Sequence, residues 1–179
     1  MTAKQFLLLG EDPPGIRLEL VDGEVFVSPS PTPAHARAII KLAFLLEDHI
    51  ERNHLGELFG DVDTILDRFT VRRPDLLFFS AARRHFVGKM AMEGPPDLAI
   101  EVISPSSIAI DREDKFEEYR KAGVTYYWMV DPAARTMEGW ELREGQYQSL
   151  GKGSGGDVMR LAPFADLQLP LARLWGTAD

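Results

Sequence analysis

The 179-residue chain contains no cysteine, which excludes a disulfide scaffold and thiol chemistry and fits a reducing cytoplasm. It also lacks any run approaching ~18 uncharged apolar residues, so we expect no membrane-spanning segment and no membrane partner. Hydrophobic residues make up 45% and charged residues 27%, values typical of a globular protein rather than a disordered one. The sequence therefore predicts a cytoplasmic protein with a single domain over residues 1–179.

Basic residues are outnumbered by acidic ones, 20 against 28, which gives a net charge of -8. Phosphate binding requires lysine and arginine, so this sum by itself argues against a nucleic-acid partner. The segment from Arg68 to Lys89 differs, since it holds six basic residues and one acid, Asp75. A local basic segment is compatible with DNA contact, although paired arginines also serve simply to solvate loops. The candidate phosphate contacts are Arg72, Arg73, Arg83 and Arg84.

Two segments in the first third of the chain have clear patterns. Apolar alternation on both sides of Asp22-Gly23 predicts a hairpin over 16–27. Its side chains Leu18, Leu20, Val25 and Val27 should share one face, which leaves Glu19 and Phe26 on the other. Thr32 followed by Pro33 predicts a helix start. The spacing of Ile39, Ala43, Leu46 and Ile50 predicts that this helix buries one face and runs to about His54.

The remaining segments predict a mixed α/β fold with a central sheet flanked by helices. Two or three strands are expected within 57–80, and the apolar run 98–103 predicts a central strand covered on both faces. A short helix is expected over 111–122, closed by Gly123. Segments 126–130, 135–142 and 146–150 predict a buried strand and then an antiparallel pair, and 151–156 (GKGSGG) predicts a flexible loop.

Glu101 is the residue that this fold does not explain, because a carboxylate in a buried strand costs several kcal/mol unless something compensates it. Asp75, directly before the apolar run 76–79, is a second carboxylate placed against the sheet. Two carboxylates on neighbouring strands form an oxygen site suited to Mg²⁺, with the backbone carbonyl of Val102 as a third ligand.

Several motifs together resemble the restriction-endonuclease-like superfamily, whose signature is PD…(D/E)xK, and within it the Uma-two family of restriction-type nucleases. Pro74-Asp75 and Glu101 match the signature. The family's motifs occur in order as LELVDGE (18–24), SPSPTPAH (28–35), RPDLLFF (73–79), PDLAIEVISPSS (96–107), DREDKFEEYRKAGV (111–124) and YWMVDP (127–132).

This resemblance implies a restriction-endonuclease-like fold and a DNA endonuclease that uses Mg²⁺ or Mn²⁺, bound by Asp75 and Glu101. The superfamily's lysine would stand two residues after Glu101, where this chain has Ile103. The family then points to Lys115 as the ammonium group. Glu101 lies about 10 Å before the expected end of its strand, and Lys115 lies about 7 Å into the expected helix, so the two could stand at similar height.

Glu19, in LELVDGE, is a weaker candidate for a further acidic ligand or a water-positioning group. Other interpretations stay open. Glu101 and Lys115 could form a buried structural ion pair, or Lys115 could be a solvated helix residue. His35 is expected to be a partly buried structural histidine. The chain could also be an inactive binding or regulatory module, while cutting both strands of a duplex would favour a homodimer.

Overall fold

The computed structural model describes residues 1–28, 31–104 and 110–175. Its centre is a six-stranded sheet with the order β10-β9-β8-β7-β6-β3. The pair β7–β8 is parallel and its neighbours are antiparallel, which confirms the predicted mixed α/β fold. The strands are β3 (Gly56–Phe59), β6 (Leu76–Ser80), β7 (Leu98–Val102), β8 (Tyr126–Asp131), β9 (Thr136–Arg143) and β10 (Gln146–Ser154).

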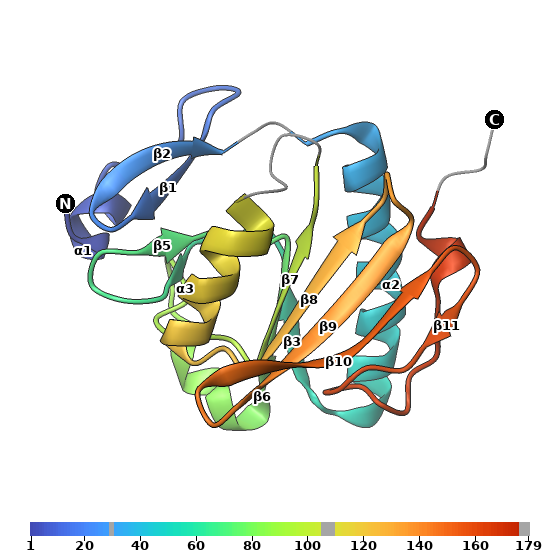
Figure 1. Cartoon of the computed structure of the whole chain (residues 1–179). Coiled ribbons are helices and arrows are strands. Elements are labelled where there is room, and N and C mark those ends of the chain that lie inside the picture. The colour runs from blue at the N-terminus through green and yellow to red at the C-terminus, as the bar shows by residue number, and fades with distance from the viewer. Residues whose placement is uncertain (29–30, 105–109, 176–179) are drawn as a thin grey trace.

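Helices cover both faces of this sheet (Figure 1). Helix α2 (Pro33–Asn53) packs on one face, where Leu42 and Leu46 meet Ile100 in the larger core cluster. Helix α3 (Lys115–Ala122) packs on the other, where Tyr119 meets the opposite side of β7 and β8. All of β7 is buried, as its apolar sequence predicted.

Helix α2 forms as its sequence predicted. The Thr32 side chain accepts a hydrogen bond from the His35 N–H, and Pro33 occupies the first turn. The helix ends at His54, which adopts a left-handed conformation with φ 53°. Its buried stripe is Ala38, Leu42, Leu46 and Ile50, so the predicted Ile39 and Ala43 lie at the margin of that stripe, only partly buried.

The second predicted helix differs from its prediction. A π-helical turn, Ile110–Asp114, comes first, and regular helix begins only at Lys115. It ends at Gly123, whose φ of 83° is the left-handed conformation that glycine adopts without strain. Strand β7 also ends at Val102, so Glu101 is its penultimate residue. The sequence analysis expected Glu101 about 10 Å before the end of its strand and Lys115 about 7 Å into its helix, and both expectations were wrong.

The predicted hairpin belongs to a separate four-stranded sheet with the order β2-β1-β5-β4. Strands β1 (Arg17–Val21) and β2 (Glu24–Ser28) pair Leu18 with Val27 and Leu20 with Val25, which confirms the predicted hairpin and its shared apolar face. Strands β4 (Thr64–Ile65) and β5 (Val71–Arg72) complete this sheet. Helix α1 (Ala3–Leu7), which the sequence analysis did not predict, packs through Phe6 against the hairpin.

The glycine-rich segment 151–156 corrects one prediction. Strand β10 continues through Ser154, with Gly151 opposite Gly139 after a bulge, so the first four residues of GKGSGG are paired strand and not flexible loop. Its partner strand supplies the backbone hydrogen bonds, which composition alone does not reveal. The short pair β11 (Val158–Met159) and β12 (Leu169–Pro170) follows. Within the described ranges, no helix combines the length and apolar character needed to cross a membrane.

Gly56 offers a test of how tightly β3 packs on β6. A Cβ there would overlap the carbonyl oxygen of Phe79 on the neighbouring strand. We therefore expect Gly56→Ala to lower the free energy of unfolding by about 2 kcal/mol or more, measured by urea denaturation. Gly156→Ala is the matched control, since a Cβ there has open space, and it should change stability by less than about 0.5 kcal/mol. Equal effects of the two substitutions would contradict this packing.

Candidate active site

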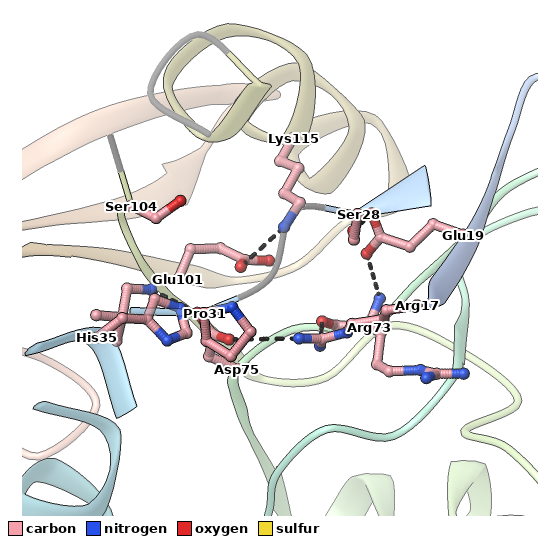
Figure 2. Close-up of a pocket in the computed structure, with 11 residues that line it drawn as sticks. Arg17, Glu19, Ser28, Pro31, His35, Arg73, Asp75, Glu101, Ser104 and Lys115 are labelled. Carbon is pink, nitrogen blue, oxygen red and sulfur yellow. Dashed lines mark hydrogen bonds and ion pairs between the residues drawn. The ribbon is translucent and has the colours of Figure 1, made fainter. Parts of the chain in front are cut away.

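Asp75 and Glu101 meet where β6 begins and β7 ends. Leu76 pairs with Ile100, and continuing this antiparallel register by one residue brings Asp75 level with Glu101. Both carboxylates are buried, at 7% and 2% exposure. They line a pocket with about 40 Å³ of room for water-sized groups (Figure 2). Its other lining residues are Arg17, Glu19, Ser28, Pro31, His35, Arg73, Val102, Ser104 and Lys115.

The two oxygens of Asp75 differ in their surroundings. Oδ2 accepts a hydrogen bond from the Val102 N–H at 2.7 Å and lies 3.1 Å from Nε2 of His35. Oδ1 has only the Arg17 guanidinium nearby among the described residues, at 3.9 Å. Oδ2 is thus held by two short contacts, whereas Oδ1 has a longer contact with the Arg17 guanidinium.

Glu101 is held by two groups from α3. Its Oε2 lies 2.9 Å from Nζ of Lys115, and its Oε1 accepts a 2.6 Å hydrogen bond from the Tyr119 hydroxyl (Figure 2 draws the lysine contact). Burial, reinforced by the negative charge of Glu101, raises the pKa of Tyr119 well above its ordinary value. Tyr119 therefore stays protonated and serves Glu101 as a donor.

Lys115 reaches the pocket despite the altered helix start. It is buried, at 7% exposure, and lies beside Glu101, so it is not the solvated helix residue of the alternative interpretation. Ile103 is buried in the core cluster with Tyr119 and Ala99. The position that the superfamily signature gives to lysine is therefore apolar here, and an ammonium from α3 occupies the same neighbourhood.

Glu19 is buried, at 3% exposure, rather than exposed as hairpin glutamates often are. Burial by itself raises its pKa, but the nearby Lys115 and Arg72 charges and hydrogen bonds from the Arg73 backbone and the Ser28 hydroxyl lower that pKa to about 2. Glu19 is thus a fully ionised carboxylate at the pocket wall.

Arg72 corrects the expectation of a phosphate-binding arginine stripe. Its side chain is 4% exposed and lies between two carboxylates. It donates to Glu19 at 3.0 Å and forms a bidentate pair with Glu118, in which one contact measures 2.7 Å. A guanidinium enclosed in this way does not reach DNA, and its pKa is raised by these partners even though burial opposes the rise.

Two further arginines of the expected stripe are also engaged within the protein. Arg73 pairs with Asp12 and Asp63, both within 2.8 Å. Arg83 pairs with Asp97 and donates to the carbonyls of residues 95 and 96. Acidic residues distant in sequence thus neutralise charges that the sequence counted as a local excess. Arg84 differs, because its side chain is 75% exposed and pairs with the surface residue Glu57.

Sequence reasoning gave too little weight to His35 and missed Arg17. His35 is 8% exposed, faces Asp75 and lines the pocket, and within the described residues its buried Nδ1 has no hydrogen-bond partner. Arg17 donates to the Arg73 carbonyl and pairs with Asp61 at 2.7 Å. The motif SPSPTPAH, which ends at His35, was the available signal for the histidine.

The donors present suit a hard divalent cation. Asp75, Glu101 and Glu19 present carboxylate oxygens to one pocket, and such oxygens are the ligands that Mg²⁺ and Mn²⁺ prefer. Within the described part of the chain, no three histidine, aspartate or glutamate side chains gather closely enough to hold an ion by themselves. An ion here would take further oxygens from backbone, water or substrate, as Mg²⁺ commonly does.

Comparison with known proteins identifies the family of this chain. Residues 3–172 match the Uma2 family, described as "Putative restriction endonuclease". The chain belongs to the Uma2 family. No curated protein of similar sequence was found.

A solved structure similar to this Uma2 chain is a "putative nuclease belonging to DUF820" from Anabaena variabilis, with a TM-score of 0.80 and 20% identity over 97% of both chains. This likeness shows a shared fold. The type IIG restriction endonuclease BpuSI matches with a TM-score of 0.40 and 13% identity, over 70% of this chain and 14% of BpuSI. A likeness that weak does not establish a common fold.

The low pKa of Glu19 predicts a specific pH dependence of stability. A carboxyl group whose pKa falls from 4.5 to about 2 on folding stabilises the folded state above pH 4.5, and this contribution is lost as the pH falls toward 2. Glu19→Gln lacks that contribution. We expect the difference in unfolding free energy between the two proteins to shrink by about 3 kcal/mol between pH 4.5 and 2, measured by urea denaturation. A constant difference would show that Glu19 has an ordinary pKa.

Proposed function

We propose that this Uma2 protein is a Mg²⁺- or Mn²⁺-dependent endonuclease that hydrolyses phosphodiester bonds in DNA. The observation that carries the proposal is one pocket that holds a buried carboxylate directly before β6, a second on the adjacent strand β7, and a buried lysine from α3. Buried ionisable groups that converge on a cavity are typical of catalytic sites.

Asp75 Oδ1 and Glu101 are the proposed metal ligands, with the Val102 carbonyl as a third. The Val102 N–H donates to Asp75, and the carbonyl of a strand residue faces the same edge as its N–H, which supports the Val102 carbonyl as this third ligand. A bound divalent ion would lower the pKa of its water and neutralise charge on the scissile phosphate. His35 and Val102 hold Asp75 Oδ2, so that Oδ1 stays oriented toward the pocket.

Lys115 is proposed to hold the attacking water or a phosphate oxygen. Its ammonium is a compact point charge that donates several hydrogen bonds, and burial strengthens its attraction for an anion. Glu101 and Lys115 now neutralise one another at 2.9 Å. Tyr119 keeps one oxygen of Glu101 fixed, which limits how far this carboxylate can move when a ligand enters.

An inactive binding or regulatory module is the second candidate function. The apolar Ile103 at the position of the superfamily lysine favours it, as does the net charge of -8. In that case the Glu101–Lys115 pair would serve folding alone. The two functions predict different consequences when Lys115 loses its charge.

The test combines cleavage and metal binding in four variants. Asp75→Asn and Glu101→Gln should each abolish cleavage of plasmid DNA with Mg²⁺ or Mn²⁺ and weaken Mn²⁺ binding measured by calorimetry. Lys115→Met should reduce cleavage by ~10²-fold or more while Mn²⁺ binding persists. Lys121→Met, an exposed lysine on the same helix, is the matched control and should keep full activity.

Thermal unfolding of each variant distinguishes a loss of activity caused by unfolding from one caused by the missing catalytic group. Removing one partner of a buried ion pair costs about 3–5 kcal/mol, so Lys115→Met is assayed below its own melting temperature. A folded Lys115→Met protein with wild-type cleavage would remove Lys115 from the mechanism. A folded wild type that binds Mn²⁺ and cuts no nucleic acid would favour the inactive module.

Arg84 is the proposed phosphate contact, as the exposed member of the four arginines. Each lost phosphate contact lowers the salt dependence of DNA affinity by about one unit of slope. We expect Arg84→Ala to reduce the slope by this amount, measured by fluorescence anisotropy at several salt concentrations. Arg52→Ala, a surface arginine paired with Asp48 on α2, is the control. Identical slopes for both variants would identify Arg84 as ordinary surface.

We also propose that the protein acts in the cytoplasm as a homodimer. Cutting both strands of a duplex takes two sites, and a two-fold dimer supplies them in symmetric positions.

A further inference from the structure

Strand β2 forms a free edge of the smaller sheet. In the part of the chain that the structure describes, β1 pairs with β2 on one side and no strand pairs with it on the other. Its central side chains are all apolar and exposed, with Val25 at 41%, Phe26 at 49% and Val27 at 66%. Soluble proteins usually protect such an edge with lysine, proline or a bulge, and Glu24 is the strand's one charged residue.

The hairpin turn determines which backbone groups this edge presents. Asp22 and Gly23 both have positive φ, at 48° and 85°, as a two-residue type I′ turn requires. The residues that flank such a turn, Val21 and Glu24, form a hydrogen-bonded pair, and bonded pairs then alternate along the ladder. The backbone groups of Val25 and Val27 therefore point away from β1, toward the free edge.

We propose that β2 pairs with β2 of a second copy of this chain, antiparallel and centred on Phe26. Val25 of one copy then stands opposite Val27 of the other, and each of these two pairs exchanges two backbone hydrogen bonds. Phe26 stands opposite its own copy in a close, non-hydrogen-bonded pair, and aromatic pairs of this kind stabilise sheets. The edge is thus complementary to itself, which is what a two-fold interface requires.

Side chains on the two faces agree with this register. Leu20 already lies beside Val25, and Leu18 beside Val27. Self-pairing would continue each of these rows into the corresponding row of the second copy, so four apolar side chains would line up across the joined sheets. Glu24 would face Ser28 of the second copy, so the register opposes no like charges.

The dimer would also bring its two pockets close together, which matters if the proposed nuclease function holds. Ser28 ends β2, lines the pocket and donates to Glu19. The two Ser28 residues would lie about 14 Å apart along the strand direction. That is well under the ~34 Å of one duplex turn, so both pockets would stand within reach of one stretch of DNA.

A single engineered cysteine tests the register, because the chain has no cysteine of its own. Opposed residues in a non-hydrogen-bonded pair have Cα atoms about 4.5 Å apart, within the range that a disulfide spans. Phe26→Cys should therefore form a covalent dimer under mild oxidation, seen on a non-reducing gel. Phe44→Cys is the matched control, an exposed phenylalanine on α2 at 65% exposure, and should stay monomeric on the gel. Equal cross-linking of the two variants, or none, would overturn the proposed pairing.

Sedimentation of uncross-linked protein tests the dimer itself. The wild type should be dimeric at ~100 μM, and Val27→Lys should weaken dimerisation at least ~10-fold, while Phe44→Lys should not. A monomeric wild type at this concentration, or a dimer that Val27→Lys leaves intact, would refute the proposal. A wild type that dimerises through β2 and fails to cut DNA would count against the nuclease function alone. Asp75→Asn should lose cleavage and keep the dimer.

Discussion

The need to compensate buried negative charge governs the arrangement of this protein. Asp75, Glu101 and Glu19 are all less than about one-tenth exposed. Each carboxylate would cost several kcal/mol without cations or hydrogen-bond donors beside it. The chain supplies Lys115 and Tyr119 from α3 for Glu101, and Arg72 from β5 for Glu19. Elements far apart in sequence must therefore dock together before any of these groups is satisfied.

Arg72 has the widest structural role among these cations. Its guanidinium pairs with Glu19 on β1 and with Glu118 on α3, and so joins the smaller sheet to the helix that carries Lys115. The bidentate geometry of this pair fixes direction as well as distance. A residue that sequence analysis assigned to DNA thus serves to position the pocket. The same charge, placed inside the protein, helps to hold Glu19 ionised.

The pocket and the β2 edge share one hairpin. One end of β2 reaches the pocket through Ser28, while its outer edge, which pairs with no strand of the described residues, presents exposed apolar side chains. The small sheet that contributes Glu19 to the pocket, and Arg72 as the partner of Glu19, therefore also offers a surface for association. If two copies pair along that edge, the register of the β2–β2 pair would set the distance between their two pockets.

The sequence by itself determined what depends on local pattern. The period of two around Asp22-Gly23 set the register of β1 and β2, and Thr32-Pro33 set the start of α2. The apolar run with a single acid marked Glu101 as buried.

The tertiary structure alone decided which charges meet. Arg72, Arg73 and Arg83 find their carboxylates across 46, 10 and 14 residues of chain, distances at which no local periodicity operates. His35 faces Asp75 for the same reason, because two elements 40 residues apart pack side by side. Local spacing dictates backbone geometry, whereas compensation of charge is a property of the packed interior.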